Sequence, residues 1–225
     1  MRKLHRLFEQ NRNWVRDVKQ GDPGFFDRLA AQQSPQLLWI GCSDSRAPAS
    51  QLVGLVPGEV FEHRNVANLV VHTDLNCLSV LQFAVDVLRV RHVVVCGHYR
   101  CGGVTAALGR ERHGLIDNWL RHVIDVVEKH RACLDAIADE QLRNDRLSEL
   151  NVIEQVHNLY QTSIVQDAWA AGHELTVHGW IYNVGNGLLR DLDLCVDQAE
   201  EAEPAYQRAL AGLIKRGGPP LVEPS

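Results

Sequence analysis

The stretch LLWIGCSDSR, residues 37–46, joins a short apolar run to a thiol, a carboxylate and a guanidinium. A second apolar run, Val93 to Gly97, leads in the same way into an unusual segment, GHYRCGG at 97–103. Short, continuously apolar runs bounded by turn residues are typical of strands buried on both faces of a parallel sheet. The two stretches therefore predict two strands of one buried sheet.

The rest of the chain predicts strands and helices in alternation. Val60 to His63 and Leu175 to Tyr182 are expected to form two further strands, while Asp74 to Arg89, Leu147 to Ala171 and about 203–215 are expected to be helices. Strand and helix alternation requires right-handed crossovers, which place helices on the faces of a parallel sheet. We expect an α/β fold with a mostly parallel central sheet flanked by helices.

Residues 2–19 predict an amphipathic helix whose apolar stripe is too broken for a lone short helix to bury. We therefore expect residues 1–33 to form an N-terminal helical arm that packs on something else. The length favours a single domain over residues 1–225. The last residues, 217–225, are expected to form a flexible tail.

Composition and charge exclude several classes of protein. The chain of 225 residues has 23 basic and 28 acidic residues, a formal charge of −5 and no basic stripe, so no nucleic-acid partner is expected. No stretch has the apolar length of a signal peptide or of a membrane span, so we expect a cytoplasmic protein with no membrane partner. In a reducing compartment the six cysteines are packed thiols, reactive thiols or metal ligands.

Three metal-binding side chains follow the ends of the first two strands described above. Ligands of an open α/β sheet bind beyond the carboxyl ends of its strands, where Cys42 follows one strand and His98 and Cys101 follow the other. Two thiolates and an imidazole suit zinc, which takes four ligands tetrahedrally. We predict one catalytic Zn2+ per chain, with its fourth position open to water or substrate.

Asp44 lies two residues beyond Cys42 and is expected either to take that fourth position or to turn away. Arg46 can hold the carboxylate by two hydrogen bonds and so keep it ionised and off the metal. Gly97, Gly102 and Gly103 allow a close backbone approach around the metal-binding loop. Because two thiolates reduce the effective charge of the zinc, we expect activity to favour alkaline pH.

The remaining cysteines and histidines have more ordinary interpretations. A single cysteine is most often a small packed side chain, and we interpret Cys77, Cys96, Cys133 and Cys195 in this way. His63, His72, His92, His122 and His178 are interpreted as hydrogen-bonded or exposed histidines. A His-x-x-Cys pair alone is as often structural as functional, but its pairing with Cys-x-Asp-x-Arg at a second strand end makes coincidence improbable.

CSDSR at 42–46 together with HYRC at 98–101 resembles the zinc signature of the β-class carbonic anhydrases. The likeness covers most of the chain, in the order found in that family. It continues through HRNVANLV at 63–70, DLNCLSVLQFAVDVL at 74–88, ELNVIEQVHNL at 149–159 and HGWIYNVGNGLLRDLD at 178–193.

The resemblance implies a zinc enzyme that reversibly hydrates carbon dioxide to bicarbonate through zinc-bound hydroxide. Cys42, His98 and Cys101 would be the zinc ligands, and Asp44 and Arg46 would switch the fourth position. The family also implies an obligate homodimer, often assembled to a homotetramer, with the arm on the partner subunit. The substrate pocket would be lined by Gln33, Phe61, Gly102 and Gly103, the first two from the neighbouring subunit.

Trp39, Arg64 and Tyr182 match a trio that binds bicarbonate at a non-catalytic site in the allosteric subgroup of this family. There, bicarbonate favours the closed form in which the residue matching Asp44 ligates zinc. An indole N–H, a guanidinium and a phenol are donors suited to a small oxyanion. Two positions depart from the family: Ala47 stands where many relatives have Val, and Arg100 where close relatives often have Gly.

Two other functions are compatible with the same residues. One is hydrolysis of carbonyl sulfide or carbon disulfide at the same zinc site, since the width of the pocket is not encoded in the motif. The other is a non-catalytic, zinc-containing bicarbonate sensor that Asp44 keeps closed.

Overall fold

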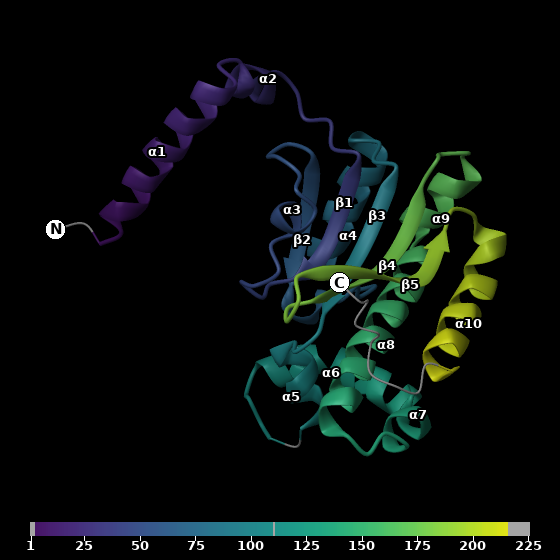
Figure 1. Ribbon diagram of the computed structural model, residues 1–225. Helices are drawn as coiled ribbons and strands as arrows, with labels where there is room; N and C mark the ends of the chain where they lie inside the picture. Colours follow the sequence, from purple (N-terminus) through teal and green to yellow (C-terminus); the bar gives the residue numbers. More distant parts are fainter. Residues whose placement is uncertain (1–2, 110, 216–225) are drawn as a thin grey trace. The chain divides into compact units, whose positions relative to one another are not determined.

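A five-stranded sheet with the strand order β2-β1-β3-β4-β5 organises the chain after residue 34 (Figure 1). Its first four strands along this order are parallel, and β5 runs antiparallel to β4. The strands are β1 Leu37–Cys42, β2 Val60–Asn65, β3 His92–His98, β4 Thr176–Asn183 and β5 Leu188–Val196. The mostly parallel sheet predicted from the sequence is confirmed, and β5 is a strand that the sequence analysis did not predict.

The computed structural model describes residues 3–109 and 111–215, and its contacts divide the chain into two compact units, Met1–Ser34 and Pro35–Ser225. The tail predicted at 217–225 lies outside the described residues. No helix of the described residues is both long enough and apolar enough to cross a membrane.

The continuous apolar runs of β1 and β3 are explained by burial on both faces of the sheet. All residues of β1 after Leu37 and all residues of β3 after His92 are buried. Side chains alternate between the faces of a strand, so Ile40 joins the main core while Trp39 joins a smaller cluster on the opposite face. Each strand therefore contributes to two apolar layers.

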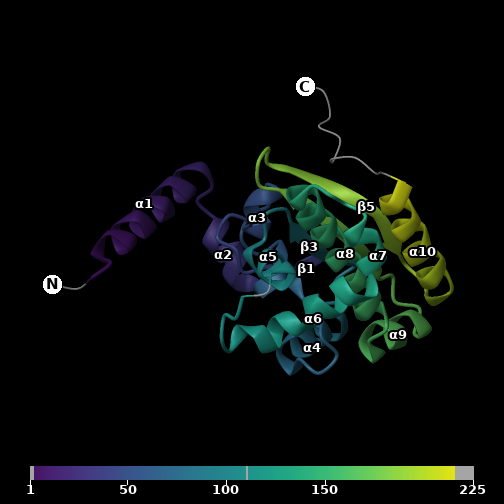
Figure 2. The ribbon, with the colours of Figure 1, turned by 90° about the horizontal axis from the view of Figure 1, so that it is seen from below.

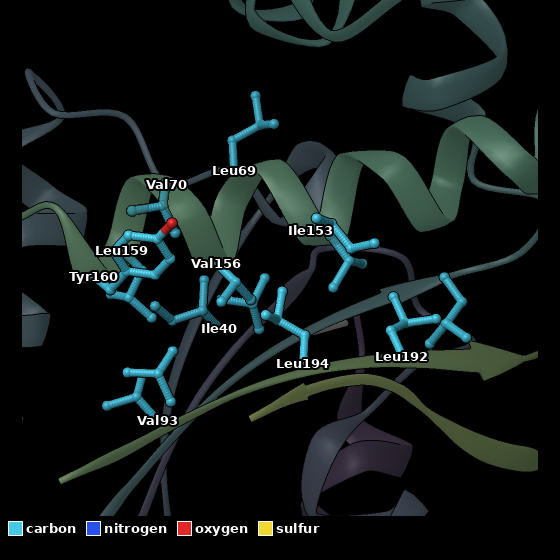
Figure 3. Packing of buried hydrophobic residues seen from close by; sticks show 14 of the residues in the cluster. Ile40, Leu69, Val70, Val93, Ile153, Val156, Leu159, Tyr160, Leu192 and Leu194 are labelled. Carbon is cyan, nitrogen blue, oxygen red and sulfur yellow. The ribbon is translucent and has the colours of Figure 1, made fainter. Parts of the chain in front are cut away.

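The main core lies between the sheet and a layer of helices, of which α8 Glu140–Tyr160 is the longest. Helix α8 contacts β3 and β4 and has α6 Ile116–Lys129 and α10 Ala199–Lys215 beside it (Figure 2). In the close view of this core, Val156 of α8 lies near Ile40 of β1 and Leu194 of β5 (Figure 3). The other helices of this unit are α3 Ala49–Leu52, α4 Leu75–Gln82, α5 Gly102–Leu108, α6 Ile116–Lys129, α7 Arg131–Asp135, α9 Ser163–Ala170 and α10 Ala199–Lys215.

The single helix predicted for residues 147–171 is wrong, because the structure has two helices there. Helix α8 begins at Glu140, where the Asp139 side chain caps it by accepting a hydrogen bond from the backbone N–H of Leu142. It ends at Tyr160, and Thr162 then caps α9 by accepting from the N–H of Val165. Apolar spacing continues across this break, so only the capping threonine signals it.

The helix predicted for residues 74–89 begins where expected, but its last part is a π-helical turn and not an α-helix. Asp74 caps α4 through a hydrogen bond from the backbone N–H of Asn76, and a π-helical turn, Phe83–Val87, follows α4. The helix predicted at about 203–215 begins earlier, at Ala199. Helices α6 and α7 were not predicted.

The N-terminal unit contains α1 His5–Gly21 and α2 Phe25–Ala31, neither of which has a buried residue in this chain. Trp14 of α1 contacts Phe26 of α2 edge to face, with ring centroids 5.5 Å apart. Leu7 and Phe8 of α1 are exposed. The prediction of a helical arm with an unburied apolar stripe is confirmed.

A buried carboxylate joins three helical segments of the main unit. Glu154 of α8 lies 2.7 Å from each of the Lys129 ammonium, the His130 Nε2 and the Tyr206 hydroxyl of α10. Burial raises the pKa of Glu154, but these donors outweigh it and lower the pKa to about 2. The ionised carboxylate therefore ties α10 to the helix layer.

Replacing Glu154 with Gln is expected to lower the free energy of unfolding by about 2–3 kcal/mol at pH 7, because a charge-assisted network is lost. The folded pKa of about 2 is below the ordinary value, so the stabilisation is present above about pH 4.5 and is lost as the pH falls toward 2. Denaturant unfolding from pH 7 to pH 3 should show the two proteins converging in stability. Glu203→Gln, at an exposed position of α10, is the control. A difference in the free energy of unfolding between the parent and Glu154→Gln that stays constant with pH would contradict this explanation.

Candidate metal centre

The pairing of β1 with β3 brings three metal-binding side chains to one edge of the sheet. Cys42 is the last residue of β1, His98 is the last residue of β3, and Cys101 precedes the first turn of α5. Their ligand atoms all lie within 4.8 Å of one another, and all three residues are buried. The structure thus brings together the three predicted metal ligands, across 59 positions of sequence between the two cysteines.

The geometry of this group fits a tetrahedral zinc ion. The Sγ atoms of Cys42 and Cys101 are 3.8 Å apart, and two thiolates at about 2.3 Å from a tetrahedral zinc are separated by about 3.8 Å. The Nε2 atom of His98 is buried and has no hydrogen-bond partner among the residues that the structure describes. Its Nδ1 lies 3.0 Å from the carbonyl oxygen of Tyr99, so Nδ1 carries the proton and Nε2 presents a lone pair to the sulfurs.

The two thiols do not ionise independently. The hydrogen bond from Cys101 lowers the pKa of Cys42, against the opposing effect of burial, and the backbone N–H groups of Asp44 and Ala67 lower it further. The same hydrogen bond, together with burial, raises the pKa of Cys101. The pair therefore holds one proton where a divalent cation would stabilise both thiolates.

Asp44 lies beside this group but is held by Arg46. The Arg46 Nε and Nη2 atoms donate to the two carboxylate oxygens at 2.9 and 2.7 Å, and the Arg46 backbone N–H donates at 2.9 Å. These contacts, the side-chain hydrogen bond above all, hold the pKa of Asp44 well below its ordinary value despite partial burial. Oδ2 of Asp44 is 3.8 Å from Nε2 of His98, so the carboxylate is next to the ligand atoms without being one of them.

Arg46 also joins the two ligand-bearing loops. Its Nη2 donates to the carbonyl oxygen of Arg100 at 3.2 Å. Arg100 has a φ of 59°, in the left-handed region that disfavours side chains with a Cβ. This backbone conformation, which glycine adopts at lower cost, presents the carbonyl of residue 100 to the guanidinium.

Arg64 supports the loop that carries Cys42 and Asp44. Its Nε donates to the carbonyl of Cys42 at 2.9 Å, and its Nη2 donates to the carbonyls of Asp44 at 2.6 Å and Ala47 at 3.2 Å. Trp39 and Tyr182 are buried with Ala47 in the smaller cluster on the same side of the sheet. In this conformation, two nitrogens of the predicted bicarbonate-binding arginine bond to the backbone.

The predicted pocket residues have different surroundings. A Cβ on Gly103 would lie 2.8 Å from Cγ1 of Val66, so the close approach predicted there is present, whereas a Cβ on Gly102 would meet no atom within 4 Å. Phe61 of β2 packs against Phe83, with ring centroids 5.8 Å apart. Gln33 belongs to the N-terminal unit, and its pocket role stays a prediction.

The sequence analysis missed a polar face of α8 that supports the metal centre. The Asn151 amide donates to the carbonyl of Ala67 at 2.9 Å, and the Gln155 side chain accepts from the N–H of Val70 at 2.8 Å. These bonds hold the segment in which the N–H of Ala67 donates to Sγ of Cys42 at 3.4 Å. Two amide side chains four residues apart, and so on one face of a helix, were the available signal.

A second missed group anchors the chain directly after His98. The Tyr99 hydroxyl donates to the Glu149 carboxylate at 2.6 Å, and Nη2 of Arg190 donates both to the Tyr99 oxygen, at 2.6 Å, and to Glu149. Burial and the negative charge of Glu149 raise the pKa of Tyr99, so the hydroxyl stays protonated. The backbone carbonyl that orients His98 is therefore fixed by a network linking β3, α8 and β5.

The remaining four cysteines differ in burial. Cys77 and Cys96 are buried, and burial raises the pKa of both thiols, which agrees with packed side chains. Cys133 is half-buried. Cys195 is exposed on β5, so its interpretation as a packed thiol is wrong. The alternation of β5 places it outside the main core, and that strand was not predicted.

Comparisons with known proteins agree with this site. A family model described as carbonic anhydrase matches residues 37–189. A carbonic anhydrase of Emericella nidulans is 50% identical over 84% of this chain and 83% of the relative.

Solved structures show the same similarity. A Coccomyxa β-carbonic anhydrase in complex with acetazolamide superposes with a TM-score of 0.87 at 38% identity, covering 94% of this chain and 98% of that one. One of two tetrameric β-carbonic anhydrases from Sordaria macrospora has a TM-score of 0.82 at 40% identity, covering 85% and 98%.

Replacing Arg100 with Gly is expected to raise the free energy of unfolding by about 0.5–1 kcal/mol, because relief of the left-handed strain exceeds the entropy that glycine adds to the unfolded chain. The contact with Arg46 uses a backbone carbonyl and is retained. Denaturant titration should show a higher midpoint with an unchanged slope. Arg121→Gly, inside α6, should lower the midpoint instead, and a lower midpoint for Arg100→Gly would contradict this explanation.

Proposed function

This chain belongs to the β-carbonic anhydrase family, so it is a carbonic anhydrase that hydrates carbon dioxide, and we propose that it does so with one zinc ion held by Cys42, His98 and Cys101. The observation that carries the proposal is the buried Nε2 of His98, which lacks a hydrogen-bond partner in the described part of the chain and lies near two sulfurs 3.8 Å apart. An uncompensated buried nitrogen is costly, and a cation would offset that cost. When bound, zinc would supply Lewis acidity that makes a hydroxide nucleophile available near neutral pH.

The residues around the ligands orient the reactants. Asp44, ionised and fixed by Arg46, accepts a hydrogen bond from the nucleophile and so orients its remaining lone pair toward the carbon of carbon dioxide. Carbon dioxide itself is apolar, and the close packing at Gly103, together with the ring of Phe61 from a neighbouring subunit, would offer it apolar surroundings. Bicarbonate leaves after the carbon–oxygen bond has formed, a water molecule would take its place, and a proton of that water would pass to solvent to restore the hydroxide.

The alternative of a sensor that Asp44 keeps permanently closed is less well supported. In the described conformation Arg46 holds both oxygens of Asp44, which leaves the fourth metal position open. Hydrolysis of carbonyl sulfide or carbon disulfide uses the same residues and is separated from hydration by the choice of substrate. The cytoplasmic location stays a prediction.

Assembly into a dimer or tetramer is supported by the exposed apolar side chains of the N-terminal unit and by the tetrameric Sordaria relative. Leu7, Phe8 and Trp14 of α1 are all exposed within one chain. We infer that a second subunit covers them. Gln33 and Phe61 would then line the pocket of the neighbouring subunit, as the family resemblance implies.

Bicarbonate inhibition would act through Arg64. The Arg64 side chain donates hydrogen bonds to the backbone carbonyls of Cys42 and Asp44. An anion that accepts hydrogen bonds from the same guanidinium would compete with these carbonyls and so loosen the loop on which Asp44 lies. Trp39 and Tyr182 are close enough to the same loop to pack with its Ala47. Asp44 could then leave Arg46 and take the open metal position, which stops catalysis. Coupling of this kind requires that bicarbonate bind the two forms differently.

The catalytic proposal is tested by zinc content and stopped-flow carbon dioxide hydration at pH 7 and pH 9. We expect one zinc per chain and higher activity at pH 9, because two thiolates weaken the acidity that zinc confers. His98→Gln should lose both zinc and activity, while Cys195→Ser, at an exposed cysteine, should keep both. Absence of stoichiometric zinc, no hydration at either pH, or turnover of carbonyl sulfide alone would each refute the proposal.

The regulatory proposal is tested by initial rates at increasing bicarbonate concentration. Inhibition should rise with bicarbonate and be relieved at high pH. Arg64→Lys should raise the bicarbonate concentration needed for half-inhibition at least about tenfold, because the two-nitrogen contact is lost. Tyr182→Phe removes only a hydroxyl from the trio and should weaken it with little change in thermal stability. Unchanged inhibition in both variants would discard this mechanism.

A further inference from the structure

Two histidines outside the metal centre meet on one face of the sheet. His92 is the first residue of β3 and His178 is the third residue of β4. In the register of these strands His92 is paired with Thr176, and Val94 with His178, so the two histidines are diagonal neighbours on the same face. Because β3 ends at His98, the pair lies at the opposite end of the strand, about 20 Å from the metal centre at about 3.3 Å per residue.

The two rings face each other through nitrogen atoms. Nδ1 of His92 is 3.2 Å from Nε2 of His178, with ring centroids 5.3 Å apart and ring planes inclined by 49°. Burial lowers the pKa of His178, and the nearby His92 lowers it further. A hydrogen bond between these two nitrogens places a proton on one and a lone pair on the other, and the neutral imidazole is the form that binds metal ions.

The nitrogen spacing fits chelation of one ion. Two imidazole nitrogens at about 2.0–2.1 Å from a tetrahedral metal ion are about 3.3–3.4 Å apart, close to the 3.2 Å between Nδ1 of His92 and Nε2 of His178. A divalent cation can replace the proton of this hydrogen bond after a small rotation of each ring. Imidazole ligands favour zinc, nickel and copper over calcium or magnesium.

Further donors lie on the same face. Cys195 of β5 is directly opposite His178 and is exposed, and Asp191 is opposite Trp180, two residues along β4. The negative charge of Asp191 acts on both His178 and Cys195. The site would thus have two imidazole ligands, water molecules, and an acidic side chain and a thiol nearby. Its setting is more exposed than that of the buried Cys42 group.

We propose that His92 and His178 form a second, non-catalytic site for a borderline divalent cation, which clamps β3 to β4 at the amino ends of these strands. The histidines are 86 positions apart in the sequence, and only the strand order brings them together. The inference does not depend on the catalytic metal, since none of its residues belongs to the Cys42, His98 and Cys101 group.

Trp180 provides a local probe for the test. Its ring is 5.7 Å from the ring of His178, so a paramagnetic ion bound by the pair should quench its fluorescence. Protein loaded with zinc and freed of excess metal is titrated with Ni2+, by fluorescence and by calorimetry. We expect one Ni2+ per chain beyond the retained zinc, with quenching that follows the binding curve.

Matched variants separate this site from other histidines. His92→Gln and His178→Gln should each weaken Ni2+ binding at least about tenfold, while retained zinc content and carbon dioxide hydration show that each variant is folded. His122→Gln, whose ring contacts Trp119, should bind Ni2+ like the parent. Trp180→Phe should lose most of the quenching but keep the calorimetric signal.

Equal Ni2+ affinity in the parent and in both histidine variants would overturn the proposal, as would the absence of Ni2+ binding below millimolar concentration. Either result would mean that His92 and His178 form only a hydrogen bond and no metal site. Zinc content reports the catalytic site, and Ni2+ binding reports the site at His92 and His178. Failure of one site is therefore distinguishable from failure of the other.

Discussion

The structure at this end of the sheet depends on two buried sulfur atoms 3.8 Å apart and a buried imidazole nitrogen that no described residue hydrogen-bonds. Left to themselves, the thiols of Cys42 and Cys101 share a proton, and Nε2 of His98 is desolvated without compensation. One divalent cation satisfies all three groups at once. A bound cation would therefore offset the cost of burying these three groups together.

The fold keeps these groups in place from several directions. Arg64 holds the loop after β1 through backbone carbonyls, and Asn151 of α8 holds the segment whose N–H contacts Cys42. Tyr99, fixed by Glu149, follows His98 directly. Because these supports come from β2, α8 and β5, the site depends on the whole sheet and its helix layer. The Asp44 and Arg46 pair is the part of the site whose contacts lie mainly within one short loop, which suits it to switching.

The strands and the metal ligands were predictable because their signals are local. Continuous apolar runs predict β1 and β3. Because the carboxyl ends of parallel strands meet at one edge of the sheet, Cys42 and His98 could be placed together. The break between α8 and α9 could not be read from apolar spacing, which continues across it. The partnership of His92 with His178 and the supports of the metal centre require the register between distant strands and helices, which no local pattern encodes.

The most direct test of the central claim is X-ray absorption at the zinc edge of the purified protein. The account predicts a first shell with two sulfur atoms at about 2.3 Å and one imidazole nitrogen at about 2.0–2.1 Å, completed by one light atom. A shell of nitrogen and oxygen alone, or one with a single sulfur, would contradict it.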